Sequence, residues 1–421
     1  MRKLCIEKTE LALVVALFVM VFYFRLIFIF FSNFDIAKLL TIFLLILIAF
    51  FFPSQIHHEI RIIGAILFFS GGFAVQTLLP VLPGPDAQVY FNNLVSHSIM
   101  ELSEMVTPIL SINVFTSSAL TFPAFLQVFI SDTDSVKPSI IILVNSLLWL
   151  LATFLWIKML SENTRHPIYQ NRFFLDILFL LMIASPSPIY WSAVFAKDVM
   201  ATALTIIAAW ALLGRRCILG IVLIVLASML RPYAIAMISC FYLFVWGRKL
   251  FLLIILIGSI TVVALFTCFS TGAIGNIPLV VAYLFASPIL TDPNNWKLLN
   301  DAGTWVFSPV LFTIEGVFYM VLFLSGFVLM TINYSYLRRE YFILFSTLIV
   351  IASILVLVGF MNLNIQGVDY GLFTIGENLI RKKFAAWPLI VTWGALALTV
   401  MWQRIKIWIA HCKTTEDRSK T

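Results

Sequence analysis

The stretch from residue 217 to residue 246, CILGIVLIVLASMLRPYAIAMISCFYLFVW, is apolar along nearly its whole length and holds a single charged residue, Arg231. A transmembrane helix needs about 20 predominantly apolar residues. Arg231 and Pro232 divide the stretch into segments 217–230 and 233–246, because proline disfavours a helical conformation in the residue before it. The pattern predicts either two short membrane helices or one broken helix.

The same apolar character extends over the whole chain of 421 residues. Hydrophobic residues make up 62% of the sequence and charged residues 11%, with a mean hydropathy of +1.04. Because soluble domains carry roughly 25% charged residues, this composition excludes an ordinary water-soluble enzyme. It predicts an all-α polytopic membrane protein in which residues 1–421 form one domain. The stretch 11–31 is expected to be a membrane helix rather than a signal peptide, since it is long and lacks a small-residue cleavage site.

Apolar runs recur along the chain and predict about twelve membrane helices. With the N-terminus in the cytoplasm, most of the 27 Lys and Arg residues fall in predicted inner loops. The positive-inside rule therefore favours an inner (cytoplasmic) membrane protein with both termini in the cytoplasm. The predicted spans are 11–31, 36–52, 62–81, 139–157, 174–191, 199–213, 217–230, 233–246, 250–269, 307–332, 341–360 and 386–408.

Three predicted outer loops interrupt the apolar pattern, at residues 82–138, 270–304 and 361–385. The first opens with the turn sequence Pro-Gly-Pro-Asp at 83–86. Apolar residues then follow at spacings of three and four, with acidic residues on another face. This spacing predicts a helix over 97–110 that lies in the headgroup plane of the membrane.

Several classes of function lose their usual sequence support. The chain contains no GxxxxGK[ST] phosphate loop, no GxSxG elbow and no HExxH zinc helix, which argues against ATP hydrolysis and zinc proteolysis. The net charge of +7 comes from short loops, so no nucleic-acid partner is expected. The five cysteines have no CxxC spacing and indicate neither disulfides nor a zinc site. No cofactor is expected, and a divalent metal ion is left open.

Asp86 is the first candidate for chemistry, because it follows a turn and precedes the helix-compatible stretch 87–96. A carboxylate at the outer membrane surface can accept a proton from a sugar hydroxyl as a general base. The alternative is a helix N-cap, and the two roles are compatible. Glu101 and Glu104, near His97, are expected either to form a polar patch that supports this site or to lie on a solvated helix face.

Arg231 is the sharper candidate for binding phosphate. A charge between two apolar segments costs several kcal/mol when it stays unpaired in hydrocarbon, so Arg231 needs an anion, water or an internal salt bridge to Asp198. A planar guanidinium can bind a phosphate through two parallel hydrogen bonds, which suits a lipid diphosphate. Tyr233 follows two residues later and is expected to support it.

Lysines and a second arginine near the predicted outer surface are further candidates. Lys197 can hold a phosphate as a point charge, with Asp198 orienting it or capping the helix, and a snorkelling lysine is the alternative. Arg381 and Lys382 belong to a basic cluster in the third outer loop, where they can attract a lipid phosphate. The alternative is that this loop is cytoplasmic and the number of spans differs by one.

Four short motifs resemble those of bacterial membrane proteins that assemble polysaccharides. They are Pro83-Gly84-Pro85-Asp86-Ala87 with Tyr90, Pro188-Ile189-Tyr190-Trp191-Ser192 with Lys197-Asp198, Leu230-Arg231-Pro232-Tyr233, and Arg381 ahead of Pro388. With the order of the spans, these motifs resemble O-antigen-type repeat-unit polymerases and related GT-C-like glycosyltransferases. Two extra spans precede the first outer loop, unlike the GT-C pattern, so the choice between the two groups stays open.

The resemblance implies a glycosyltransferase that uses a polyprenyl-diphosphate-linked saccharide as donor, most simply as a repeat-unit polymerase. Asp86 would take the proton from the acceptor hydroxyl. Lys197, Arg231 and Arg381 would stabilise charge on the departing phosphate, and losing one such contact typically lowers turnover by about 10² to 10³. The implied partners are the lipid-linked donor and acceptor, the bilayer and other glycan-assembly proteins.

Two other functions compete with this hypothesis. A transporter or flippase for a lipid-linked glycan or small anion would place the same arginines along a path through the bilayer. Such a carrier needs polar groups at mid-depth that both faces can reach, whereas an enzyme gathers them on one side. A purely structural subunit of the glycan machinery predicts that no single outer charge matters.

Overall fold

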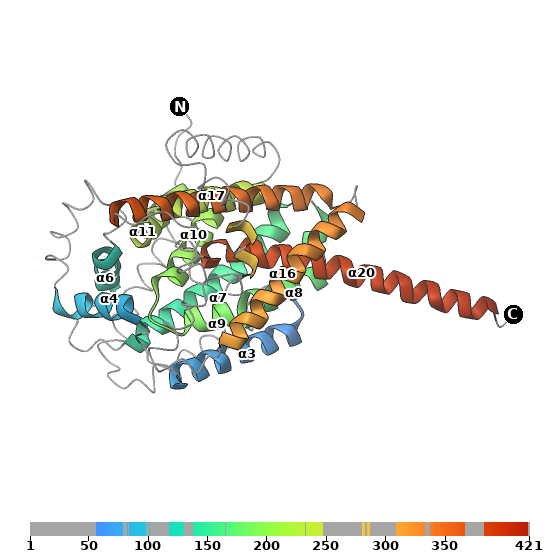
Figure 1. Cartoon of the computed structure of the whole chain (residues 1–421), viewed down its shortest axis with the longest axis horizontal. Coiled ribbons are helices and arrows are strands. Elements are labelled where there is room, and N and C mark those ends of the chain that lie inside the picture. Colours follow the sequence, from blue (N-terminus) through green and yellow to red (C-terminus); the bar gives the residue numbers. More distant parts are fainter. Residues whose placement is uncertain are drawn as a thin grey trace, which may run out of the picture.

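The computed structural model of the chain is helical in the part that it describes (Figure 1). This part comprises residues 56–78, 84–97, 118–129, 138–164, 166–231, 233–246, 309–332, 337–366 and 383–419, with Leu82, Glu101 and the short stretches 280–282 and 284–286. Within these ranges no residue belongs to a strand. The prediction of an all-α protein is therefore confirmed.

The described helices agree closely in position with the apolar runs of the sequence. Their bounds are α3 His58–Leu78, α4 Gly84–Ser96, α6 Ser118–Phe129, α7 Pro138–Asn163, η1 Pro167–Gln170, α8 Arg172–Ala184, α9 Pro186–Ser192, α10 Lys197–Leu213, α11 Cys217–Leu230, α12 Ala234–Trp246, α16 Pro309–Ile332, α17 Arg338–Gln366, η2 Lys383–Ala386 and α20 Trp387–Ser419. The η elements are short 3₁₀ helices.

Three described helices are long and apolar enough to cross a membrane. They cover Val144–Asn163 in α7, Leu311–Leu329 in α16, and Lys383–Cys412, which joins η2 to most of α20. The bent pair α8 and α9 makes a fourth if it is one span. Helices of this kind support the expected membrane character, whereas the number of about twelve spans stays a prediction.

The chain bends by 46° between α8 and α9, where the sequence predicts one continuous span over 174–191. Ser185 separates the two helices, and Pro186 is the first residue of α9. Proline lacks an N–H and fits the first turn of a helix but not its interior, so α8 ends here and α9 starts in a new direction. Hydropathy is continuous across the bend, which is why it predicts a single span.

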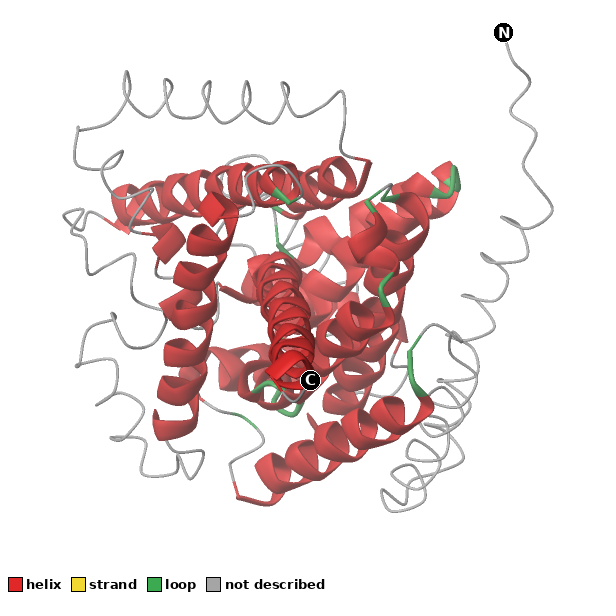
Figure 2. Cartoon of the chain, turned by 90° about the vertical axis from the view of Figure 1, so that its right-hand side faces the viewer, coloured by secondary structure: helices red, strands yellow, loops and turns green. Residues whose placement is uncertain are grey.

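The first half of α20 forms the centre of the described bundle. Figure 2 shows the helix nearly end-on, with other helices around it. Side chains are buried without interruption over residues 383–397, including Trp387 and Trp393, and α8, α16 and α17 contact this helix. Beyond residue 401 the helix extends away from the bundle and exposes its side chains, among them Ile407 (Figure 1).

A second buried helix, α10, packs against α7, α11 and α12. All its side chains from Lys197 to Ala209 are buried. Alanines at 201, 203, 208 and 209 let the neighbouring helices approach closely, as small residues do in membrane bundles. Its first turn is exceptional, because Lys197 and Asp198 place two charges inside the protein.

Some sequence predictions fall on residues outside the described part. These are the spans 11–31, 36–52 and 250–269, most of the interfacial helix over 97–110, and most of the loops 270–304 and 361–385. The predicted outer loop 82–138 is described in part. It contains α4 and α6, which contact each other.

Candidate functional site

The candidate site begins at the N-terminus of α10. Ala196 precedes the helix in an extended conformation, and its carbonyl accepts a hydrogen bond from the Asn145 side chain of α7 at 2.8 Å. Lys197 and Asp198 follow, with exposed fractions of 1% and 6%. Because buried charges require partners, the contacts of these two side chains define the site.

Lys197 connects α10 to α4. Its Nζ donates a hydrogen bond to the Tyr90 hydroxyl at 2.9 Å and lies 4.5 Å from the centroid of the same ring. Tyr90 is buried and packs edge-on against Phe122 of α6, with ring centroids 5.7 Å apart. Tyr90 therefore offers the ammonium both a hydroxyl acceptor and an aromatic ring, each of which stabilises a cation.

Asp198 pairs with Arg231, the residue that ends α11. Arg231 Nε donates to Asp198 Oδ1 at 2.9 Å, and Nη2 contacts the same oxygen. Asp198 thus supplies the opposite charge that a buried guanidinium requires. The ring centroid of Tyr233 lies 6.0 Å from the guanidinium carbon. The internal salt bridge that the sequence raised as an alternative is thus present.

A narrow cleft lies against this ion pair, with room for about one water molecule. Asp198 and Arg231 form its charged end, and threonines and small apolar side chains form the rest. Its lining residues are Asp198, Ala201, Thr202, Thr205, Arg231, Tyr233, Ala234, Met237 and Ala385. The walls therefore come from α10, from the α11–α12 break with α12, and from η2.

The geometry of Arg231 suits an anionic ligand. Its side chain is 17% exposed, against 7% for Asp198. The ion pair uses Nε and Nη2, and within the described part of the chain Nη1 has no hydrogen-bond partner.

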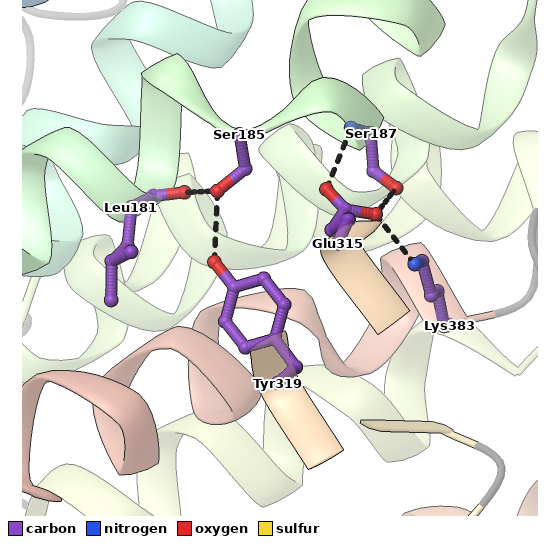
Figure 3. A network of polar contacts seen from close by, with 6 residues as sticks. All are labelled: Leu181, Ser185, Ser187, Glu315, Tyr319 and Lys383. Atoms are coloured by element: carbon purple, nitrogen blue, oxygen red, sulfur yellow. Dashed lines mark hydrogen bonds and ion pairs between the residues drawn. The ribbon is translucent and has the colours of Figure 1, made fainter. Parts of the chain in front are cut away.

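A second buried polar cluster lies between α9, α16 and η2 (Figure 3). Lys383 Nζ donates to Glu315 Oε2 at 2.7 Å, and each side chain is only 1% exposed. The Ser187 N–H donates to Glu315 Oε1 at 2.8 Å, and the Ser187 hydroxyl contacts Oε2. We call Ser187, Glu315 and Lys383 the Glu315 network.

A third pair joins the residue before α3 to α8. The Nδ1 atom of His57 lies 2.5 Å from Asp176 Oδ2, and the His57 N–H donates to Asp176 Oδ1 at 2.9 Å. Asp176 sits in an apolar run, where an acidic residue signals a partner, but nothing local identifies His57.

The predicted site residues have different outcomes. Four of them, Lys197, Asp198, Arg231 and Tyr233, lie together around the first turn of α10. Asp86 lies in the first turn of α4, the helix that carries Tyr90, and its side chain is not described. α4 begins two residues earlier, at Gly84, so Asp86 does not occupy the N-cap position.

The other predicted residues contribute little to this geometry. Glu101 is exposed. Glu104, Arg381 and Lys382 lie outside the described residues. Lys383, the last member of the basic cluster, is described, and it is buried in the Glu315 network.

The sequence hypothesis missed Glu315 and used Lys383 only as a member of the basic cluster. Glu315 is the single charged residue of α16, and an ionisable residue inside a membrane span is a functional candidate by default. That signal was present in the sequence.

No group of His, Cys, Asp and Glu suited to holding a metal ion occurs within the described ranges. Searches against protein-family models, curated proteins and solved structures find no match to this chain.

Proposed function

We propose that this chain is a membrane glycosyltransferase that uses a polyprenyl-diphosphate-linked saccharide as donor, and that it acts as a repeat-unit polymerase of a surface polysaccharide at the inner membrane. One observation carries the proposal. Arg231 reaches the first turn of α10, where Lys197 lies, and Lys197 contacts α4, the helix whose first turn contains Asp86.

The reaction assigns one role to each of these groups. The acceptor hydroxyl attacks the anomeric carbon, the bond from that carbon to the diphosphate oxygen breaks, and Asp86 takes the hydroxyl proton. Arg231 borders the cleft and stabilises the negative charge that grows on the departing lipid diphosphate, and Lys197, which is buried and does not line the cleft, adds to the positive field there. Arg381 and Lys382 immediately precede η2, which forms one wall of the cleft, and in this proposal they add to the same field.

The proposed reaction needs no separate energy source. A sugar diphosphate carries its own leaving group, so the reaction needs no nucleotide hydrolysis, in agreement with the absence of the usual nucleotide motifs from the sequence. The apolar lining supplied by Ala234, Met237 and Ala385 keeps the charged end of the cleft in surroundings of low polarity. Fixed charges act more strongly there than in water.

The decisive test is Asp86→Asn in cells whose surface glycan depends on this protein. We expect loss of chain extension with unchanged abundance of the protein in the membrane, because asparagine keeps the shape of the side chain but cannot accept the proton. The matched control is Glu59→Gln, which neutralises an exposed carboxylate in the first turn of α3. Long glycans in the Asp86→Asn strain would remove Asp86 as the base.

A carrier of the same lipid-linked glycan is the second candidate, and the two helix breaks favour it. The break at Ser185 and the break at Arg231 both bring polar groups into an apolar bundle, as discontinuous helices do in transporters. Purified protein in vesicles distinguishes the two functions. A carrier moves a fluorescent polyprenyl diphosphate across the bilayer without consuming it, whereas the proposed enzyme leaves it on its original side.

A further inference from the structure

Glu315 joins two segments that are far apart in the sequence. Its carboxylate accepts hydrogen bonds from Ser187, 128 residues earlier, and from Lys383, 68 residues later. One turn along α16, the Tyr319 hydroxyl lies 2.8 Å from Ser185 Oγ. Figure 3 shows these contacts together: Glu315 and Tyr319 of α16 bond to the α8–α9 bend, and Glu315 also bonds to Lys383 of η2.

Each of the two segments that Glu315 contacts continues along the chain into residues that line the cleft. The α8–α9 bend continues through α9 and the short turn 193–196 into Lys197 and Asp198. On the other side, η2 carries Ala385, two residues after Lys383, into the cleft lining. The buried network thus lies behind the site, and neither Glu315 nor Lys383 is among the residues that line the cleft.

We infer that Glu315 is a positioning residue, whose ion pair with Lys383 and hydrogen bonds to Ser187 set the separation between the α10 wall and the η2 wall of the cleft. The physical reason is geometric. A single carboxylate that contacts both segments ties them to a common point, and a buried ion pair is directional in a way that apolar packing is not. The expected change in ligand binding rests on the proposed function, whereas the expected change in cleft geometry does not.

The variant that isolates this role is the double substitution Glu315→Leu with Lys383→Met. Replacing a buried ion pair by apolar side chains of similar volume often leaves a protein as stable as before or more stable. A residue that only stabilises the fold is therefore replaced without loss. A positioning residue is not, because leucine and methionine provide no directional contact between η2 and the α8–α9 bend.

The first measurement needs no ligand. All five native cysteines are replaced by serine or alanine, Ala385→Cys is introduced, and the labelling rate of the new thiol by a small methanethiosulfonate reagent is recorded in membranes. In the double variant we expect labelling to accelerate roughly tenfold, the equivalent of losing one charge-assisted hydrogen bond, with the thermal midpoint within a few degrees of the parent. An unchanged labelling rate overturns the inference.

Two further variants make the result specific. Asp176→Asn disturbs the polar pair at the far end of α8, about 13 Å from Ser185 along the helix axis, and is expected to leave labelling of the introduced thiol unchanged. Glu315→Asp keeps the charge but withdraws the carboxylate by about one bond length, or roughly 1.5 Å. It is expected to label at an intermediate rate, and it keeps the test decisive if the double variant does not fold.

The second measurement is binding of farnesyl diphosphate, a short soluble analogue of the lipid diphosphate. We expect roughly tenfold weaker binding to the double variant than to the parent. Equal affinity for both proteins, with unchanged labelling, rejects the positioning role. If the parent protein does not bind farnesyl diphosphate but labelling of the introduced thiol still accelerates, the proposed function fails and the positioning role stands.

Discussion

Two buried ion pairs in the described part of the chain, Asp198–Arg231 and Glu315–Lys383, have the same chemistry and different surroundings. Asp198 and Arg231 border a cleft, and the Arg231 side chain is 17% exposed. Glu315 and Lys383 are each 1% exposed and are enclosed by α9, α16 and η2. A ligand in the cleft can contact the first pair, whereas no ligand can reach the second pair.

This difference separates a binding role from a positioning role. A guanidinium at a cleft keeps donors available and is stabilised further when an anion arrives. A lysine that is fully enclosed contributes through the geometry of its surroundings, because its charge is already compensated inside the protein. Substitutions in the two pairs should therefore act by different routes. A substitution at the first pair removes a direct contact to the ligand, whereas a substitution at the second pair changes stability or the positions of the cleft walls.

Glu315→Gln should give the largest loss of stability. Removing one partner of a buried ion pair leaves the other charge uncompensated and costs about 3 to 5 kcal/mol. Unfolding of the purified protein in mixed detergent micelles measures this change. Glu162→Gln is the control, since Glu162 and Lys158 form an exposed pair at 3.9 Å, whose loss should cost no more than about 1 kcal/mol. Equal losses for the two variants would contradict the assignment.

Arg231→Ala should lower sugar transfer by about 10² to 10³, as is typical when one charged contact to a developing anion is removed. Arg231→Lys should recover part of this loss, because lysine supplies the charge but not the planar donor pair. Transfer from a radiolabelled lipid-linked saccharide measures both. Arg339→Ala, at an exposed arginine in the first turn of α17, is the matched control. Activity of Arg231→Ala near the parent level would place the phosphate elsewhere.

Tyr90→Phe tests the contact between α4 and the charged end of α10. The substitution keeps the ring below Lys197 Nζ but removes the hydroxyl that accepts its hydrogen bond. A hydrogen bond to a charged group contributes about 1.5 to 3 kcal/mol, and we expect a loss near the lower value because the aromatic contact remains. The same unfolding assay detects it, and a stability unchanged within error would show that this bond contributes little.

Tyr319→Phe should have the smallest effect, about 1 kcal/mol, because the bond between the Tyr319 and Ser185 hydroxyls joins two neutral groups. Affinity for farnesyl diphosphate should stay within twofold of the parent, since Glu315 still holds the bend through Ser187. A larger loss of affinity than of stability would mean that Tyr319, rather than Glu315, carries the positioning role.

Much of the helical architecture follows from local sequence. The segment predicted as 217–230 is α11 residue for residue, and 233–246 differs from α12 by one residue. Runs of apolar side chains and the conformational limits of proline act within a few neighbouring residues, so they are visible in the sequence. The bend at Ser185 was signalled by two prolines, but continuous hydropathy across 174–191 masked it.

The partners of buried charges were harder to predict. The position of Arg231 in an apolar stretch predicted that it has a charged partner, and Asp198 was one of the predicted alternatives. Lys383 and Glu315 gave no comparable indication of each other, because an ion pair between residues 68 positions apart depends on how η2 and α16 pack. The same holds for His57 and Asp176, which are 119 positions apart.

The sequence by itself determined that this chain folds as helices in an apolar environment, because composition and hydropathy act residue by residue and need no tertiary information. Which charges meet was decided only by the tertiary structure. A buried charge must find an opposite charge or a hydrogen-bond partner wherever packing brings one within reach, and that distance is a property of the assembled helices.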